Sequence, residues 1–240
     1  MRQKLRRLIA MISLLLFPVT LNFLSPYVSV DGAINGIVSG SILVFIFMFL
    51  TGIFFRRAWC SYICPVSCLS DISLGINQKN VNRKVTRMIR YSIFTVWAGV
   101  IITMFILAGG IKGVNPLHLT EQVVSVDSPL KFINYYFVLL LLLILTLTVG
   151  KRGACQSICW MSPFLTAGAV IGKLLRIPQI KIKADSSQCV GCGICDKNCP
   201  MSIPVSQELK KGYINTYDCI LCGECVDHCK KKVLQYRISK

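Results

Sequence analysis

Eight cysteines near the carboxyl end stand in two blocks with the same spacing, CxxCxxCxxxC. The first block reads CVGCGICDKNCP and the second reads CILCGECVDHCK. This spacing is typical of a pair of 4Fe–4S clusters, each held by three thiolates of one block and the last thiolate of the other. The rule predicts two ligand sets, which are Cys189, Cys192, Cys195 and Cys229 for the first cluster and Cys219, Cys222, Cys225 and Cys199 for the second.

Disulfide and zinc interpretations explain these two blocks less well. Disulfides are rare on the cytoplasmic side of a membrane, and zinc sites normally use two spaced pairs of ligands. Glycines at Gly191, Gly193 and Gly223 favour clusters, because a loop that folds tightly around a cluster needs positive φ angles and close backbone approach. Pro200 follows the first block and Lys230 the second; this departure affects the turn and not the ligands.

A second group of cysteines lies earlier in the chain, in the related sequences CSYIC and CQSIC. The first contains Cys60 and Cys64, and the second contains Cys155 and Cys159. An arginine precedes each motif, and a short apolar stretch follows each, from Val66 to Ile76 or from Pro163 to Leu175. We interpret this as an internal duplication of a unit with a helical hairpin, a CxxxC motif and a short interfacial helix.

If each CxxxC motif is helical, its two cysteines lie on one face. We therefore expect Cys60, Cys64, Cys155 and Cys159 to meet at the membrane edge and hold a further metal or iron–sulfur centre, or to act as a redox-active thiol set. The alternative is that they are small buried residues that help two helix ends to pack. Cys68 has no counterpart in the second motif, so we expect it to be structural.

The composition indicates a membrane protein. Of the 240 residues, 54% are hydrophobic, and the mean hydropathy is +0.61. Four apolar segments approach the roughly 20 residues that cross a bilayer, and these are Leu8 to Leu24, Ile37 to Phe55, Tyr91 to Ile111 and Phe132 to Val149. The first also resembles a secretory signal, but it has no clear cleavage site; we expect an uncleaved helix kinked near Pro18.

Basic residues set the expected orientation. They gather before the first segment and between the second and third, and they are scarce in the other two connections. The positive-inside rule then predicts a multi-pass protein of the cell membrane with both termini in the cytoplasm, where thiols stay reduced. The net charge of +17 is explained by these bilayer flanks and does not require nucleic acid as a partner.

These expectations combine into one fold class, a membrane α-helical protein. Residues 1–180 are expected to form four transmembrane helices in two pseudo-repeated hairpins, with the two CxxxC motifs at the cytoplasmic face. Residues 181–240 are expected to form a small cytoplasmic α+β ferredoxin domain with two 4Fe–4S clusters.

The arrangement resembles a known family. The carboxyl-terminal region is similar to the bacterial ferredoxin with two 4Fe–4S clusters. With the helices, Cys64-Pro65 and the second CxxxC, nearly the whole chain resembles the NapH/NosR-type membrane ferredoxins, which include cytochrome oxidase accessory proteins. Cys159 departs from the family pattern, because Trp160 stands where proline is expected. The resemblance implies an electron-transfer subunit that works between quinol and a redox partner.

The expected function is electron relay between a cytoplasmic redox partner and the membrane, with the quinone pool or a partner subunit as the other end. No Rossmann fingerprint, P-loop or Ser-His-Asp arrangement is present, so we expect a non-catalytic electron-transfer subunit. Two alternatives are a membrane metal reductase or assembly factor for a copper or haem enzyme, and a redox sensor. The sensor is less favoured because no recognisable output domain follows Cys229.

Basic charge and two histidines complete the predictions. The region from Lys181 onward carries ten basic and six acidic side chains, which suits an acidic ferredoxin or flavodoxin as partner, or an anionic lipid surface. His118, in the loop after the third segment, is a weak candidate for proton exchange with quinone. His228, inside the second block, is expected to affect solvation of a cluster and not to bind iron.

Overall fold

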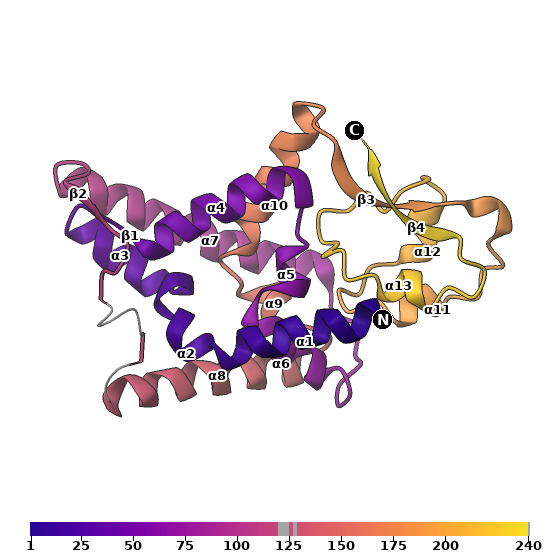
Figure 1. The fold of residues 1–240 in the computed structure, drawn as a ribbon, viewed down its shortest axis with the longest axis horizontal. Helices are drawn as coiled ribbons and strands as arrows, with labels where there is room; N and C mark the ends of the chain where they lie inside the picture. The colour runs from indigo at the N-terminus through magenta and orange to yellow at the C-terminus, as the bar shows by residue number, and fades with distance from the viewer. Residues whose placement is uncertain (120–124, 127–128, 240) are drawn as a thin grey trace.

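The computed structural model describes residues 1–119, 125–126 and 129–239. Within them the chain is mainly helical, with two two-stranded sheets. The longer helices run along the long axis of the molecule, and the cysteine-rich carboxyl-terminal region lies at one end (Figure 1). The amino terminus lies at that same end (Figure 1).

The described elements divide between a helical part and a cysteine-rich part. The helical part contains α1 (Arg2–Leu15), α2 (Phe17–Thr20), η1 (Asn22–Leu24), α3 (Pro26–Ile34), β1 (Ile37–Ser39), α4 (Gly40–Phe55), α5 (Trp59–Tyr62), α6 (Pro65–Ser73), α7 (Arg83–Leu107), β2 (Gly113–Asn115), α8 (Pro129–Val149), α9 (Gly153–Ser157) and α10 (Ser162–Leu174). The carboxyl-terminal part contains β3 (Gln179–Ala184), η2 (Ser186–Gln188), α11 (Ile194–Lys197), α12 (Val205–Leu209), α13 (Glu224–Asp227) and β4 (Leu234–Ser239).

Two described helices are long and apolar enough to cross a bilayer. They are α7 and the segment Lys131–Val149 of α8, judged by length and composition. Little of either is buried inside the molecule, 6% and 17% of their most apolar windows, so most of their apolar surface faces outward. The fourth predicted segment thus matches α8, and the third matches the carboxyl-terminal two thirds of α7.

The other two predicted spans are shorter in the structure. The second segment forms α4, which has 16 residues because its first three residues pair as β1 with β2 in parallel register. The first segment is divided: α1 ends at Leu15, α2 begins at Phe17, and α3 occupies what was expected to be a connection. The break agrees with the kink expected at Pro18, which lies in the first turn of α2 where a missing N–H is tolerated.

Helix α10 packs along α4 through small residues. A Cβ added at Gly52 of α4 would lie 2.7 Å from the backbone oxygen of Leu165 on α10, so the two backbones approach closely. Gly168 and Gly172 of α10 face the backbone of α4 in the same way. The stretch from Pro163 to Leu175 is expected from the sequence to form a short helix at the membrane interface. In the structure almost all of it belongs to α10, which packs against α4.

The carboxyl-terminal part is built on the antiparallel pair of β3 and β4. In their register, Gln179 lies opposite Ser239 and Ala184 lies opposite Leu234. Its core contains Ile182, Met201 and Leu234, together with several of the cysteines. This is the small α+β unit expected from the sequence. Its first strand begins two residues before the predicted boundary at 181, which stays a prediction.

Arginines join the two parts. Asp218 accepts hydrogen bonds from Arg83 and Arg90 of α7, at 2.9 and 3.1 Å, and from Arg87. Arg6 of α1 bridges Glu224 of the carboxyl-terminal part and Asp71 of α6, at 3.0 and 2.6 Å. Because most of these groups are largely buried, removing one partner leaves a charge that water cannot reach. The contacts hold the cysteine-rich part over the end of the helices in one orientation.

Candidate iron–sulfur centres

The structure brings together the four cysteines predicted for the second cluster. Cys199, Cys219, Cys222 and Cys225 are between 6% and 8% exposed, and all four line one small cavity in the core of the carboxyl-terminal part. Gly223, within this block, has φ 78°, as the expected tight loop requires. The arrangement fits a buried cluster.

The cysteines predicted for the first cluster lie nearer the surface. Cys189 and Cys192 are exposed, and Cys195 and Cys229 are partly buried and pack against the same core. Gly191 and Gly193 have φ angles of 69° and 68°. A Cβ at either glycine would meet nothing within 4 Å, so these positions favour glycine for its backbone conformation alone.

Burial keeps several of these thiols protonated when no metal is bound. It raises the pKa of Cys199 and Cys195 to about 11 and that of Cys222 to about 12. Iron is bound by thiolates, so assembly of a cluster must release these protons.

The four cysteines of the CxxxC motifs also meet. Cys60, Cys64, Cys155 and Cys159 line one small cavity. Met201 and Ile220 of the carboxyl-terminal part close another side of it, so the cavity lies between the two parts of the molecule. The sequence analysis expected these four cysteines to meet, and in the structure they line the same cavity.

The expectation that each CxxxC motif forms a helix with both cysteines on one face is wrong, because neither motif is one continuous helix. Cys60 lies on α5, which ends at Tyr62, and Cys64 is the extended residue that precedes α6. Pro65 explains this conformation, since a proline disfavours the α-helical region for the residue before it. In the second motif, α9 ends at Ser157, before Cys159, and a proline appears only at the start of α10.

Two buried arginines line the cavity beside these cysteines. Arg57 and Arg152 are each 1% exposed, and each precedes the first cysteine of its motif by three residues. Arg152 donates from Nη1 to the backbone oxygen of Cys60, at 3.1 Å, and from Nη2 to Ser67, at 2.9 Å. Nε of both arginines and Nη1 of Arg57 are buried without a hydrogen-bond partner.

These arginines supply the positive charge that a thiolate-bound centre needs. Burial opposes the charge on Arg57, but Cys60, Asp218 and Cys159 outweigh it and raise its pKa. A set of four thiolates around iron carries net negative charge, which two buried guanidinium groups would balance. The sequence pattern accounts for Arg57 as one of the basic residues that flank the second apolar segment, and the shared position of Arg57 and Arg152 before the two motifs is the signal that points to the cavity.

Among the residues that the structure describes, no group of three or more His, Cys, Asp or Glu side chains is placed to hold one metal ion. This statement covers the described ferredoxin cysteines as well as the CxxxC set.

Three other residues singled out from the sequence lie outside these cavities. Cys68 is partly buried on α6, and burial raises its pKa. His118 lies 2.7 Å from Asp31 through Nε2, and His228 contacts the backbone oxygen of Glu224, at 2.9 Å, through Nδ1. None of the three is placed to bind a metal in the described structure.

A second, much larger cavity adjoins the CxxxC site. It has a volume of about 750 Å³, and Cys64, Cys155, Cys159 and Met161 line both cavities. The rest of its wall is mainly apolar and comes from the broken first segment, α3 and α8, with polar groups at Asn22, Lys131 and Asn134. No local pattern in the sequence predicts this cavity, because its walls come from segments far apart in the chain.

Two family descriptions match separate parts of this chain. Residues 188–234 match a family described as a 4Fe-4S dicluster domain. Residues 37–84 match a family described as a 4Fe-4S binding domain, and this range includes Cys60 and Cys64. The chain is similar to no solved structure.

Curated relatives resemble most of the chain. YccM of Escherichia coli, named for electron transport, is 23% identical over 85% of this chain and 57% of its own length. The ferredoxin-type protein NapH of Escherichia coli is 26% identical over 81% of this chain and 66% of its own. The methylamine utilization ferredoxin-type protein MauN of Methylobacillus flagellatus is 28% identical over 67% and 53%.

This chain therefore spans somewhat more than half of YccM and MauN and about two thirds of NapH. The shared names, the two family matches and the grouped cysteines agree on one chemistry. The chain resembles the NapH-type 4Fe–4S ferredoxin proteins, and its two matched ranges and grouped cysteines support an iron–sulfur electron-transfer role.

Proposed function

We propose that this protein transfers electrons between an exposed 4Fe–4S cluster at its carboxyl-terminal end and a quinone held in the large cavity of its helical part. The cysteine sets would hold two ferredoxin clusters and a third iron–sulfur centre between Cys60, Cys64, Cys155 and Cys159. When bound, such clusters supply one-electron steps.

The observation that carries the proposal is that neighbouring cavities share their walls. Met201 and Ile220 line both the cavity of the second ferredoxin set and the CxxxC cavity. Cys64, Cys155 and Cys159 line both the CxxxC cavity and the large one. Centres held at these places would adjoin one another through these shared walls, and the first ferredoxin set, with its exposed Cys189 and Cys192, would form the outer end.

The large cavity suits a quinone in size and polarity. Its volume of about 750 Å³ lies within the range of small-molecule sites, and its wall is mostly apolar with a few polar groups. Trp160 donates from its indole N–H to the backbone oxygen of Leu24, at 3.1 Å, which fixes one side of the wall beside Cys159.

A four-span topology with both termini in the cytoplasm remains part of the proposal. The helices α1, α4, α7 and α8 run along the same axis (Figure 1). The broken first segment is compatible with a bilayer because irregular backbone is tolerated there when it lines a cavity, and Phe17, Asn22 and Leu24 do so. The described arginine contacts lie at the end that carries the ferredoxin region, as the positive-inside rule expects.

The decisive test is to purify the full chain without oxygen, count iron and sulfide, and reconstitute it with a quinone. Three clusters require about 12 irons per chain, and two require about eight. The double variant Cys64→Ser, Cys155→Ser is expected to lose about four irons and all quinone reduction, while the ferredoxin clusters keep their electron paramagnetic resonance signals. Cys68→Ser, in the same helix end, is the matched control.

An unchanged iron content and unchanged quinone reduction in the double variant would contradict the third centre. Binding of copper at the CxxxC cysteines, with no iron there after anaerobic purification, would instead support the metal-reductase alternative.

A further inference from the structure

The geometry points to a docking surface for an acidic soluble one-electron carrier protein, formed by the exposed lysines that follow two cysteines of the first cluster set, Lys197 after Cys195 and Lys230, Lys231 and Lys232 after Cys229. The inference rests on the proposed function in one respect, since it takes Cys189, Cys192, Cys195 and Cys229 to hold a cluster. It adds the location and charge of the surface and the chemical class of the partner.

The loop that contains Cys189 and Cys192 offers direct access to this cluster site. Cys189 and Cys192 are exposed, and Val190 between them is 66% exposed. Electron transfer needs close approach and a modest contact, and weak redox complexes have small interfaces. An apolar side chain at the tip with charged groups around it is the arrangement expected of such a contact.

The lysines that follow Cys229 lie in a tight turn at this cysteine, which is the last predicted ligand of the same cluster. Lys230, Lys231 and Lys232 directly follow Cys229, and the backbone N–H of Lys232 donates to the oxygen of Cys229 at 3.0 Å. Lys232 has φ 52°, a conformation in which glycine is ordinarily preferred. Lys197 is exposed at the end of α11, two residues after Cys195.

The lysine side chains that follow Cys229 are exposed. In the described structure, Lys230, Lys231 and Lys232 form no salt bridge. Of the acidic side chains of the same region, Glu208, Asp218, Glu224 and Asp227 pair with basic side chains of the molecule, whereas Asp185 and Asp196 accept hydrogen bonds from Ser187 and Ser206 and keep their charge. The lysines therefore present a field that would attract a negatively charged protein.

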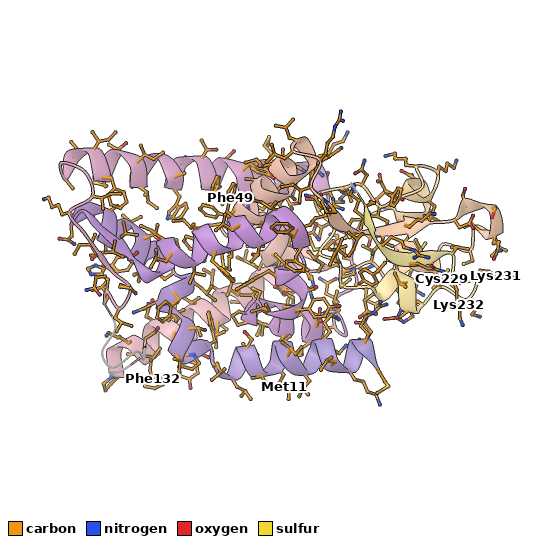
Figure 2. The ribbon with its side chains drawn as sticks, turned by 45° about the horizontal axis from the view of Figure 1, so that its top comes forward. Met11, Phe49, Phe132, Cys229, Lys231 and Lys232 are labelled. Carbon is orange, nitrogen blue, oxygen red and sulfur yellow. The ribbon has the colours of Figure 1, made fainter. Side chains whose placement is uncertain are left out.

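A protein is favoured over a lipid surface by position. Figure 2 shows Cys229, Lys231 and Lys232 together at one extremity of the molecule, with Phe132 of α8 near the other. The apolar helices that would contact lipid lie between these ends (Figure 2). A surface at the extremity faces the aqueous side when the helices stand across a bilayer.

The reaction at this surface is the passage of one electron, with no bond formed or broken. The carrier loses one electron and the centre held by Cys189, Cys192, Cys195 and Cys229 gains it, or the reverse. An acidic flavodoxin, reduced photochemically, is a suitable probe because its cofactor transfers single electrons and its surface is negative.

The test compares two triple variants of the full chain in nanodiscs. Lys230→Gln, Lys231→Gln, Lys232→Gln removes the proposed surface, and Lys4→Gln, Lys79→Gln, Lys84→Gln removes the same charge from exposed lysines elsewhere. At low ionic strength the first is expected to slow reduction by flavodoxin about tenfold, with a weaker salt dependence than the unmodified protein. The second is expected to leave both unchanged.

Dithionite separates this inference from the function on which it rests. Both variants should be reduced by dithionite at the unmodified rate and keep their full iron content; iron missing from the unmodified protein would contradict the proposed function instead. Equal flavodoxin rates in all three proteins would overturn the docking surface. Protection of Lys230 to Lys232 from acylation in phosphatidylglycerol nanodiscs, and not in phosphatidylcholine nanodiscs, would also overturn it and favour lipid.

Discussion

Arg152 donates a hydrogen bond from Nη1 to the backbone oxygen of Cys60, at 3.1 Å. The arginine precedes the second CxxxC motif and the cysteine belongs to the first, so this contact joins the two motifs at the cavity that all four cysteines line. Asp71, which accepts from Arg152 and from Arg6, fixes the guanidinium from its other side.

Replacement of Arg152 by Gln is expected to destabilise the CxxxC site. The change leaves Asp71 with Arg6 alone, so the loss should be about 2 kcal/mol, below the 3–5 typical of a buried pair broken outright. Iron content should fall by about four atoms if the third centre is lost. Thermal unfolding and iron analysis measure the two effects.

Arg7→Gln is the control for this change, since Arg7 is exposed and reaches Glu224 only at 3.5 Å. Equal stability and equal iron content in the Arg152 and Arg7 variants would show that Arg152 does not hold the site together.

The Asp71 carboxylate should make stability depend on pH in the acidic range. Burial alone would raise its pKa, but Arg152 and Arg6 outweigh burial and hold the pKa below its usual range. A depressed carboxyl pKa contributes stability above the unfolded value near 4, and this contribution is lost as pH falls through the folded value. The stability difference between the unmodified protein and Asp71→Asn should therefore be full at pH 6 and shrink below about pH 4.

Tryptophan fluorescence during denaturant unfolding measures this difference, and comparison of the two proteins at each pH cancels acid damage to the clusters. A difference that stays constant from pH 6 to about pH 3 would contradict the assigned role of the ion pairs.

Filling the large cavity is expected to impair quinone reduction without affecting the clusters. Val138 of α8 lines the cavity, and a tryptophan there would occupy part of its volume of about 750 Å³. The KM for a short-chain quinone should rise about tenfold, corresponding to a loss of roughly 1.4 kcal/mol in binding. Leu140→Trp, two residues away at a position 55% exposed, should change neither KM nor iron content. A shared response of both variants would argue against a quinone in this cavity.

Close packing of α4 and α10 predicts that Gly52 does not tolerate a side chain. Gly52→Ala would bring a Cβ to 2.7 Å from the backbone oxygen of Leu165, and such overpacking typically costs about 1–3 kcal/mol. Gly99→Ala, on α7 with nothing within 4 Å, should be neutral or stabilising by about 1 kcal/mol. Unfolding midpoints in one detergent compare the two; a Gly52 variant as stable as the Gly99 variant would show that the helices separate at little cost.

The cysteine spacing by itself determined the chemistry and much of the local structure. Two blocks of CxxCxxCxxxC predicted an iron–sulfur protein, and the glycines within them predicted positive φ angles that Gly191, Gly193 and Gly223 adopt. Apolar length predicted the spans in α7 and α8. These properties depend on residues near one another in the chain, where spacing and side-chain type are sufficient.

Tertiary structure decided which of these parts adjoin. Pro18 indicated a kink, but the division of the first segment into α1, α2 and η1 depends on how it packs around the large cavity. Arg57 counts among the basic residues that flank an apolar segment, yet in the structure Arg57 and Arg152 are both buried and line the cavity of the CxxxC cysteines. Neighbouring cavities share walls formed by Met201, Ile220 and the CxxxC cysteines. These residues are far apart in the sequence, so only the packing of the folded chain could bring them together.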